Sequence, residues 1–230
     1  MKSKSVSGSN IVSIGAKRAE AHFPSIARVD AYWEAIRNGR LMPSRSDVDP
    51  RGISDVLEFA FILEKVAPGV ARLRLAGMHL TDIMGMEVRG MPVTAMFLPE
   101  ARRELQGVLE TLLDSPATAR LALEAERGLT RPTLQAQMVL LPLKDEHGRP
   151  TRVLGALQTH GTIGRGPRRF RITGKQVDPI LGDAPSRFSM PAARAHTHTE
   201  ASEEAKPFDG ADNAGAPLLR LVHNADDREG

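Results

Sequence analysis

A helical period of apolar residues comes first along the chain, in residues 25–38. The apolar positions of this stretch lie three or four residues apart, at Ile26, Val29, Tyr32, Trp33 and Ile36. This spacing predicts an amphipathic helix. Ser25 suits the N-cap of that helix, and Gly39 suits its end.

Alternating apolar and polar positions then predict five strands. They span residues 57–66, 70–77, 117–126, 132–143 and 151–160. A section with helical spacing separates the second strand from the third. The predicted order is one helix, two strands, a helical block and three strands. This order is typical of an α+β fold with a five-stranded antiparallel sheet. We expect the helical block to cover one face of this sheet, because strands such as 132–143 are too apolar for both faces to meet water.

The composition of the chain changes near Gly161. From Thr162 to Gly230, Leu, Ile, Val and Phe make up 12 of 69 residues, which is below the roughly 20% expected of ordered domains. We therefore predict a flexible N-terminus (1–24), a folded domain (25–161) and a mostly disordered tail (162–230).

Two pieces of the predicted tail stand apart from the rest. Residues 168–174 can add a short strand, and residues 216–224 form a short apolar motif. Its apolar residues Leu218, Leu219 and Leu221 suit docking on a partner as a strand or a helical turn. Chance apolar residues in an inert tail explain both patterns equally well.

Composition also excludes several kinds of chemistry. The chain has no cysteine, so disulfides, thiol nucleophiles and cysteine-bound metal centres are excluded. A net charge of +3 is too small to indicate nucleic-acid binding. There is no signal-peptide pattern and no apolar run of about 18 residues, so we expect a cytoplasmic protein without a membrane span. Because Walker A, G-x-S-x-G and H-E-x-x-H motifs are also missing, we expect no enzyme activity.

Several short motifs resemble one known family. They are Tyr32–Trp33, the P-x-R-x-x-x-D-P segment Pro43–Pro50, R-x-A-G at Arg74–Gly77, G-x-E-x-R-G at Gly85–Gly90, and Leu141–Leu143. With these motifs and the order of its elements, the chain resembles the PAS_5 family, the single-domain PAS proteins of alphaproteobacteria, over residues 25–161. The resemblance implies a PAS fold and a part in signal transduction.

A PAS fold implies a pocket between its sheet and its helical block. Here the apolar residues expected to line that pocket are Leu75, Leu80, Ile83, Met84, Met96, Leu109, Met138 and Leu140. Apolar residues at this spacing form plain core more often than a ligand site, so the sequence names no ligand. The missing cysteine excludes a flavin adduct of the LOV type and a thioester-linked chromophore.

Histidines give two weak signals for cofactors. His79 is a candidate axial ligand for haem, but a lone histidine at such a position is more often a satisfied structural residue, so we do not expect haem. His196 and His198 form a His-x-His without a third ligand nearby. They indicate adventitious metal binding at most, and we expect no metal site.

The Pro43–Arg51 segment combines two prolines with four charges, Arg45, Asp47, Asp49 and Arg51. We interpret it chiefly as a structural clasp in which Asp49 caps a short helix starting at Pro50. In that interpretation Arg45, Asp47 and Arg51 pair with one another or with backbone carbonyls. The alternative is an arginine-lined anion site.

Tyr32 and Trp33 are candidates for an interaction surface, because PAS domains frequently form homodimers through their N-terminal helix. Trp33 can instead cover the sheet of its own domain. The sequence leaves both arrangements open.

Two functions are compatible with these observations. The first is a signalling module without an output domain, because residues after Gly161 leave no room for a kinase, cyclase or DNA-binding domain. Such a module acts in trans by binding a partner protein. In the alternative, a small molecule or second messenger in the pocket is itself the signal. A third idea, catalysis on a phosphorylated substrate at Arg45 and Arg51, lacks an acid or base.

Overall fold

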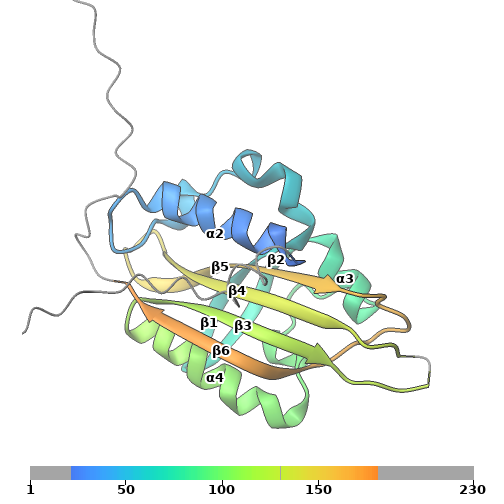
Figure 1. Ribbon diagram of the computed structural model, residues 1–230. Coiled ribbons are helices and arrows are strands. Elements are labelled where there is room, and N and C mark those ends of the chain that lie inside the picture. The colour runs from blue at the N-terminus through green and yellow to red at the C-terminus, as the bar shows by residue number, and fades with distance from the viewer. Residues whose placement is uncertain (1–21, 130, 181–230) are drawn as a thin grey trace, which may run out of the picture. The chain divides into compact units, whose positions relative to one another are not determined.

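The computed structural model describes residues 22–129 and 131–180 of the 230-residue chain (Figure 1). Its α-helices are α2 (Pro24–Arg37), α3 (Met78–Met84) and α4 (Pro99–Asp114), and its 3-10 helices are η1 (Arg45–Asp47), η2 (Pro50–Phe59) and η3 (Val93–Met96). Its strands are β1 (Ala60–Ala67), β2 (Val70–Ala76), β3 (Ala117–Ala125), β4 (Gln135–Lys144), β5 (Pro150–His160) and β6 (Phe170–Pro179).

The strands form one antiparallel sheet in the order β2-β1-β5-β4-β3-β6. The predicted number of five strands is wrong, because the segment 168–174 contributes to a sixth strand, β6, which pairs with β3 along its length. Phe170 is the one fully buried residue of β6. A polar edge strand of this kind is stabilised by backbone pairing rather than by apolar burial. The ordered fold therefore continues past the predicted boundary at Gly161.

Helices cover both faces of the sheet, as Figure 1 shows for α2 on one side and α4 on the other. Strand β4 divides its side chains between two cores. Met138 and Leu140 pack with α3 and α4, whereas Val139 and Leu141 pack with α2 and η2. The predicted cover by the helical block is confirmed for one face, and α2 with η2 covers the other.

Helix α2 lies flat against the sheet because of Trp33. The indole is buried, and its Nε1–H donates to the carbonyl oxygen of Pro142 at 3.0 Å. The helix begins at Pro24 with Phe23 as its N-cap, two residues before the predicted cap Ser25, whose amide donates instead to Gln158 Oε1. It ends at Asn38, which adopts a left-handed conformation.

A buried arginine holds the loops before β6 in place. Arg168 is completely buried. Its guanidinium donates to the carbonyl oxygens of Ile163, Glu126 (3.1 Å) and Pro132 (2.7 Å). These bonds join the loop before β6 to the loop between β3 and β4, so this residue stabilises the end of the sheet that carries β6.

Gly155 of β5 gives a first testable prediction. It lies opposite Phe61 of β1, and a Cβ added at this position would be 2.3 Å from the buried Phe61 ring. Gly155→Ala should therefore lower the free energy of unfolding by about 1–3 kcal/mol, the usual cost of overpacking a core, as measured by urea denaturation.

Gly107→Ala is the matched control for Gly155→Ala. Gly107 lies in α4, is exposed, and has no atom within 4 Å of an added Cβ. This change should raise the free energy of unfolding by about 0.5–1 kcal/mol. Equal effects of the two substitutions would contradict the packing assigned to Phe61.

Asp145, in the turn between β4 and β5, predicts a pH dependence of stability. Its carboxylate accepts hydrogen bonds from the amides of Arg149 and His147 and from the Thr151 hydroxyl, each at 2.9 Å. These bonds, the Arg149 amide first, lower the pKa of Asp145 to about 2. A depressed pKa stabilises the fold above the pKa of the unfolded chain, and this stability is lost as the pH falls from about 4 to 2.

Asp145→Asn should consequently destabilise the protein at neutral pH, and its difference from wild type should shrink as the pH falls through this window. Glu146→Gln is the control, because the Glu146 side chain is 87% exposed. Denaturation curves between pH 2 and pH 7 measure the effect, and a difference that does not change with pH would rule out this role for Asp145.

Candidate functional site: an apolar groove

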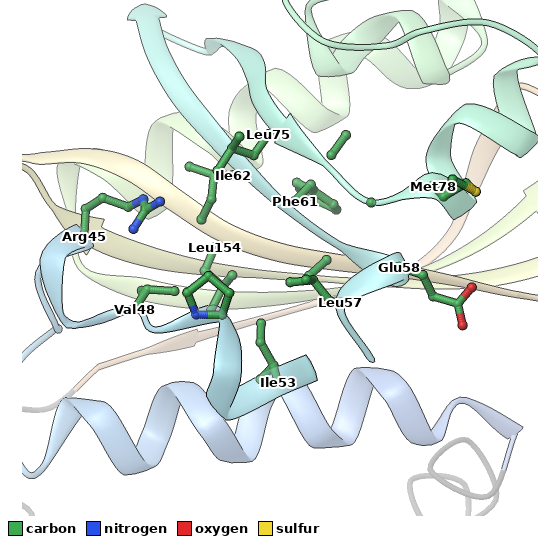
Figure 2. A pocket seen from close by; sticks show the side chains of 14 residues that line it. Arg45, Val48, Ile53, Leu57, Glu58, Phe61, Ile62, Leu75, Met78 and Leu154 are labelled. Atoms are coloured by element: carbon green, nitrogen blue, oxygen red, sulfur yellow. The ribbon is translucent and has the colours of Figure 1, made fainter. Parts of the chain in front are cut away.

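A groove of about 390 Å³ opens where η1 and η2 meet strands β1 and β2 (Figure 2). We call it the β2 groove. It is lined by Arg45, Val48, Pro50, Ile53, Leu57, Glu58, Ala60, Phe61, Ile62, Leu75, Ala76, Gly77, Met78 and Leu154. Its volume is within the range of small-molecule sites in proteins, and its lining is almost entirely apolar.

Three strands supply the floor of the groove. Ile62 of β1 pairs with Leu75 of β2 on one side and with Leu154 of β5 on the other. Residues paired across a sheet share a face. Ile62 and Leu154 belong to the core beneath α2 and η2, so the groove lies on that face and not between the sheet and α4.

A β-bulge decides which way Leu75 points. Ile62 pairs with Leu75 but Leu63 pairs with Leu73, so Arg74 is an extra residue in β2. An extra residue reverses the alternation of side chains beyond it. Leu73 is therefore buried on the α4 face, whereas Leu75 is half exposed on the groove face.

Gly77 allows the end of β2 to approach η2 closely. Its amide donates to the carbonyl oxygen of Ala60 at 2.8 Å, and a Cβ at this position would lie 2.1 Å from the carbonyl oxygen of Glu58. A side chain would push these backbones apart. The glycine of the R-x-A-G motif thus closes one side of the groove.

The two charged residues of the lining lie at opposite ends. Figure 2 shows the Arg45 guanidinium directed into one end and the Glu58 carboxylate at the other. The Arg45 side chain is half-buried and forms no hydrogen bond or ion pair with any residue that the structure describes.

A second group of charges continues from the Arg45 end. Two residues beyond Ile62 on the same face, Glu64 binds the guanidinium groups of Arg72 (2.8 Å), Arg74 (3.2 Å) and Arg152 (2.9 Å). The hydrogen bond from Arg72 is the main reason that the pKa of Glu64 is lowered. One carboxylate shared by three arginines leaves this end of the groove positively charged.

The residues predicted to line a pocket between the sheet and the helical block are mostly buried in the core. Of these eight residues, Leu75 lies on the outer groove because of the bulge. The other seven have at most 2% of their surface exposed and form continuous core: Leu80, Ile83, Met84, Met96, Leu109, Met138 and Leu140.

The Pro43–Arg51 segment has the capping that the sequence predicts but different ion pairs. Asp49 Oδ1 accepts a hydrogen bond from the Arg51 amide at 3.0 Å, with Pro50 as the first residue of η2. Asp47 pairs with Arg40 (2.8 Å) and not with Arg45 or Arg51. The Ser44 amide also donates to Asp47 at 2.9 Å, and this bond is the main cause of the lowered pKa of Asp47.

Two further contacts fasten the same segment to the rest of the domain. The Tyr32 hydroxyl donates to the carbonyl oxygen of Asp49 at 3.0 Å and accepts from its amide at 2.8 Å. The amide of Lys144, in β4, donates to the carbonyl oxygen of Pro43 at 2.9 Å. The segment is therefore tied to α2 and to the sheet, which fixes η1 and the backbone of Arg45.

The structure shows one of the two arrangements that the sequence left open for Trp33. Its side chain is buried against the sheet of its own domain, and the hydroxyl of the half-buried Tyr32 binds Asp49. Leu218, Leu219 and Leu221 lie outside the described residues, as do His196 and His198.

His79 connects α3 to β5. Its Nε2 lies 3.2 Å from the Thr159 amide and 3.0 Å from the Thr159 hydroxyl, and its ring packs edge-on against Phe59. Burial lowers the pKa of His79. The imidazole nitrogen thus accepts a hydrogen bond from the amide of a strand residue. This is a structural role, which the sequence favoured over haem ligation.

Residues 22–129 and 131–180 contain no group of three His, Asp or Glu side chains placed to hold a metal ion. In the same part of the chain, no helix is both long and apolar enough to cross a membrane.

The groove residues Ile53, Leu57 and Leu154 were not predicted from the sequence. Leu57 and Leu154 belong to stretches that sequence patterns assign to strands, and no local signal brings η2 against β1 and β5. Arg45 was predicted, as part of a clasp or an anion site, and the structure places it at the groove.

Comparisons with solved structures give matches at low identity. The blue-light photoreceptor Aureochrome1 LOV is 13% identical, with 48% of this chain and 88% of that chain covered and a TM-score of 0.36. A sensory box histidine kinase/response regulator from Burkholderia thailandensis E264 is 18% identical, with 48% and 84% covered and a TM-score of 0.32. No curated protein matches the chain.

Comparison with protein families gives a match that covers more of the chain. The family model of PAS_5, described as a PAS domain, matches residues 21–158. These residues contain η1, η2, α2 and strands β1 to β4 completely and most of β5. Because the match spans more than half of the sequence, the chain belongs to the PAS_5 family of PAS domains.

Proposed function

We propose that this PAS protein is a signalling module that binds a partner protein at the rim of the β2 groove and acts on that partner in trans. One observation carries the proposal. Leu57, Leu75 and Met78 are 43%, 50% and 72% exposed, and all three line the same groove.

Clustering is what distinguishes these side chains from ordinary exposed apolar residues. Single surface leucines and methionines are common, whereas a contiguous exposed apolar patch marks an interaction site. The three residues come from η2, β2 and the start of α3, so only the folded chain brings them together. A partner that covers them would remove apolar surface from water, which favours association.

A catalytic role is not part of this proposal. The charged side chains of the groove are one guanidinium and one carboxylate at opposite ends. Acid–base catalysis needs groups within hydrogen-bond reach of one substrate proton, and a nucleophile needs an adjacent base. The groove lining has no such pair.

A small-molecule sensor is the second candidate function. The volume of the groove, about 390 Å³, favours it because sites for small ligands are usually about 300–1,000 Å³. In this alternative the occupancy of the groove is the signal, and a fixed partner is not required.

Substitution at the rim tests partner binding. The double variant Leu75→Gln and Met78→Gln should bind a partner protein at least tenfold more weakly than wild type, because two apolar contacts are lost at the centre of the interface. The partner is recovered by crosslinking in the cells that express the protein, and its Kd for each purified variant is then measured.

Met86→Gln is the matched control. Met86 is 50% exposed, the same fraction as Leu75, but does not line the groove. Its Kd should stay within twofold of wild type. If the partner binds the double variant as tightly as it binds the control, the rim is not the docking surface.

A further inference from the structure

We propose that the β2 groove binds a small amphiphilic anion, an unbranched aliphatic chain with one carboxylate head. The aliphatic chain lies on the apolar floor, and the carboxylate binds the Arg45 guanidinium. This site is separate from the space between the sheet and α4, and it does not depend on the existence of a protein partner.

The floor and walls of the groove suit an aliphatic chain. Ile53, Ile62 and Leu154 are buried beneath the groove, whereas Leu57 and Leu75 are partly open to water. A saturated chain has no polar atoms that would lose hydrogen bonds on entering such a site. Covering the exposed parts of the lining removes apolar surface from water on both molecules, and each buried methylene contributes about 0.8 kcal/mol.

Arg45 provides the site for the head group. Its guanidinium is directed into the groove and has no partner among the described residues (Figure 2). A planar guanidinium binds a carboxylate through two parallel hydrogen bonds, which are stronger than neutral ones. The side chain can therefore gain a partner without breaking an existing contact.

The backbone around Arg45 is already held in place. Arg45 begins η1, and that turn is fixed because Asp47 binds both the Ser44 amide and the Arg40 guanidinium. The engagement of Asp47 with Arg40 also keeps this carboxylate from neutralising Arg45. A binding group held on a fixed backbone loses less conformational freedom when the ligand arrives.

The charges at the two ends of the groove determine the orientation and the sign of the ligand. Glu64, the carboxylate beyond the Arg45 end, is shared by three arginines, so the potential there is positive. Glu58 lies at the opposite end. A carboxylate head is attracted to the first end and repelled from the second, whereas the one carboxylate in the lining that a cationic head could bind is the exposed Glu58.

The closed end at Gly77 favours a small ligand over a peptide segment. Gly77 packs directly against the backbone of Glu58, and its amide donates a hydrogen bond to the carbonyl oxygen of Ala60. An extended peptide that runs through the groove would need an opening at this point. A single aliphatic chain can end there, and a volume of about 390 Å³ is in the range of sites for one small molecule.

Isothermal titration of the full chain with four simple amphiphiles tests the proposal. The probes are octanoate, decanoate, decanol and decyltrimethylammonium, each below its micelle concentration. Decanoate should bind with one-to-one stoichiometry and about fifteenfold more tightly than octanoate, because it buries two more methylenes. Decanol should bind at least tenfold more weakly than decanoate, and decyltrimethylammonium more weakly still.

Variants of two arginines on one segment assign the head-group site. Arg45→Gln should weaken decanoate binding at least tenfold, to the level of decanol, and leave decanol binding unchanged. Arg45→Lys keeps the charge without the paired donors and should recover part of the affinity. Arg51→Gln removes the same charge from an exposed residue that does not line the groove, and it should bind decanoate like wild type.

Two results would overturn the proposal. One is the absence of saturable decanoate binding by the wild-type chain, and the other is an equal loss of affinity in Arg45→Gln and Arg51→Gln. Either result leaves partner binding at the rim unaffected, because that is measured with Leu75 and Met78 variants and a protein ligand. Saturable decanoate binding in a chain that captures no partner would instead support the amphiphile site alone.

Discussion

The burial of strands β4 and β5 on both faces is the constraint on which the rest of the structure depends. Residues 138–143 and 153–157 are buried without interruption, so each side of the sheet must be covered by a helical layer. Helices α3, η3 and α4 cover one side, and α2 with η2 covers the other. The bond from the Trp33 indole to the carbonyl oxygen of Pro142 fixes α2 at the centre of that second layer.

The β2 groove exists because this second layer does not reach the edge of the sheet. Helix α2 packs over β4 and β5, and η2 packs beside β1, whereas β2 is the outermost strand on that side. The bulge at Arg74 then turns Leu75 toward the uncovered area. An apolar side chain at the boundary of a helical layer is partly exposed, and here several such side chains gather in one place.

The Arg45 end of the groove is positively charged because the carboxylates near it form ion pairs with other arginines. Asp47, two residues from Arg45, and Glu64, two residues from Ile62, are both bound by other arginines. Arg45 is thereby left as a cation at the end of an apolar surface. The same segment that fastens η1 to α2 and β4 thus also presents an unpaired guanidinium, so the clasp and the anion-site interpretations of Pro43–Arg51 are compatible with each other.

The sequence by itself determined the order of the elements, the Asp49 cap of η2 and the apolar character of β4 and β5, because these depend on residues close together in the chain. Tertiary structure alone decided the pairing of the polar strand β6 with β3, the face on which Leu75 lies and the choice of Arg40 as the partner of Asp47. Local periodicity reports which positions can be buried. It does not report register, bulges or ion-pair partners, because these are set by contacts between segments that are distant in the sequence.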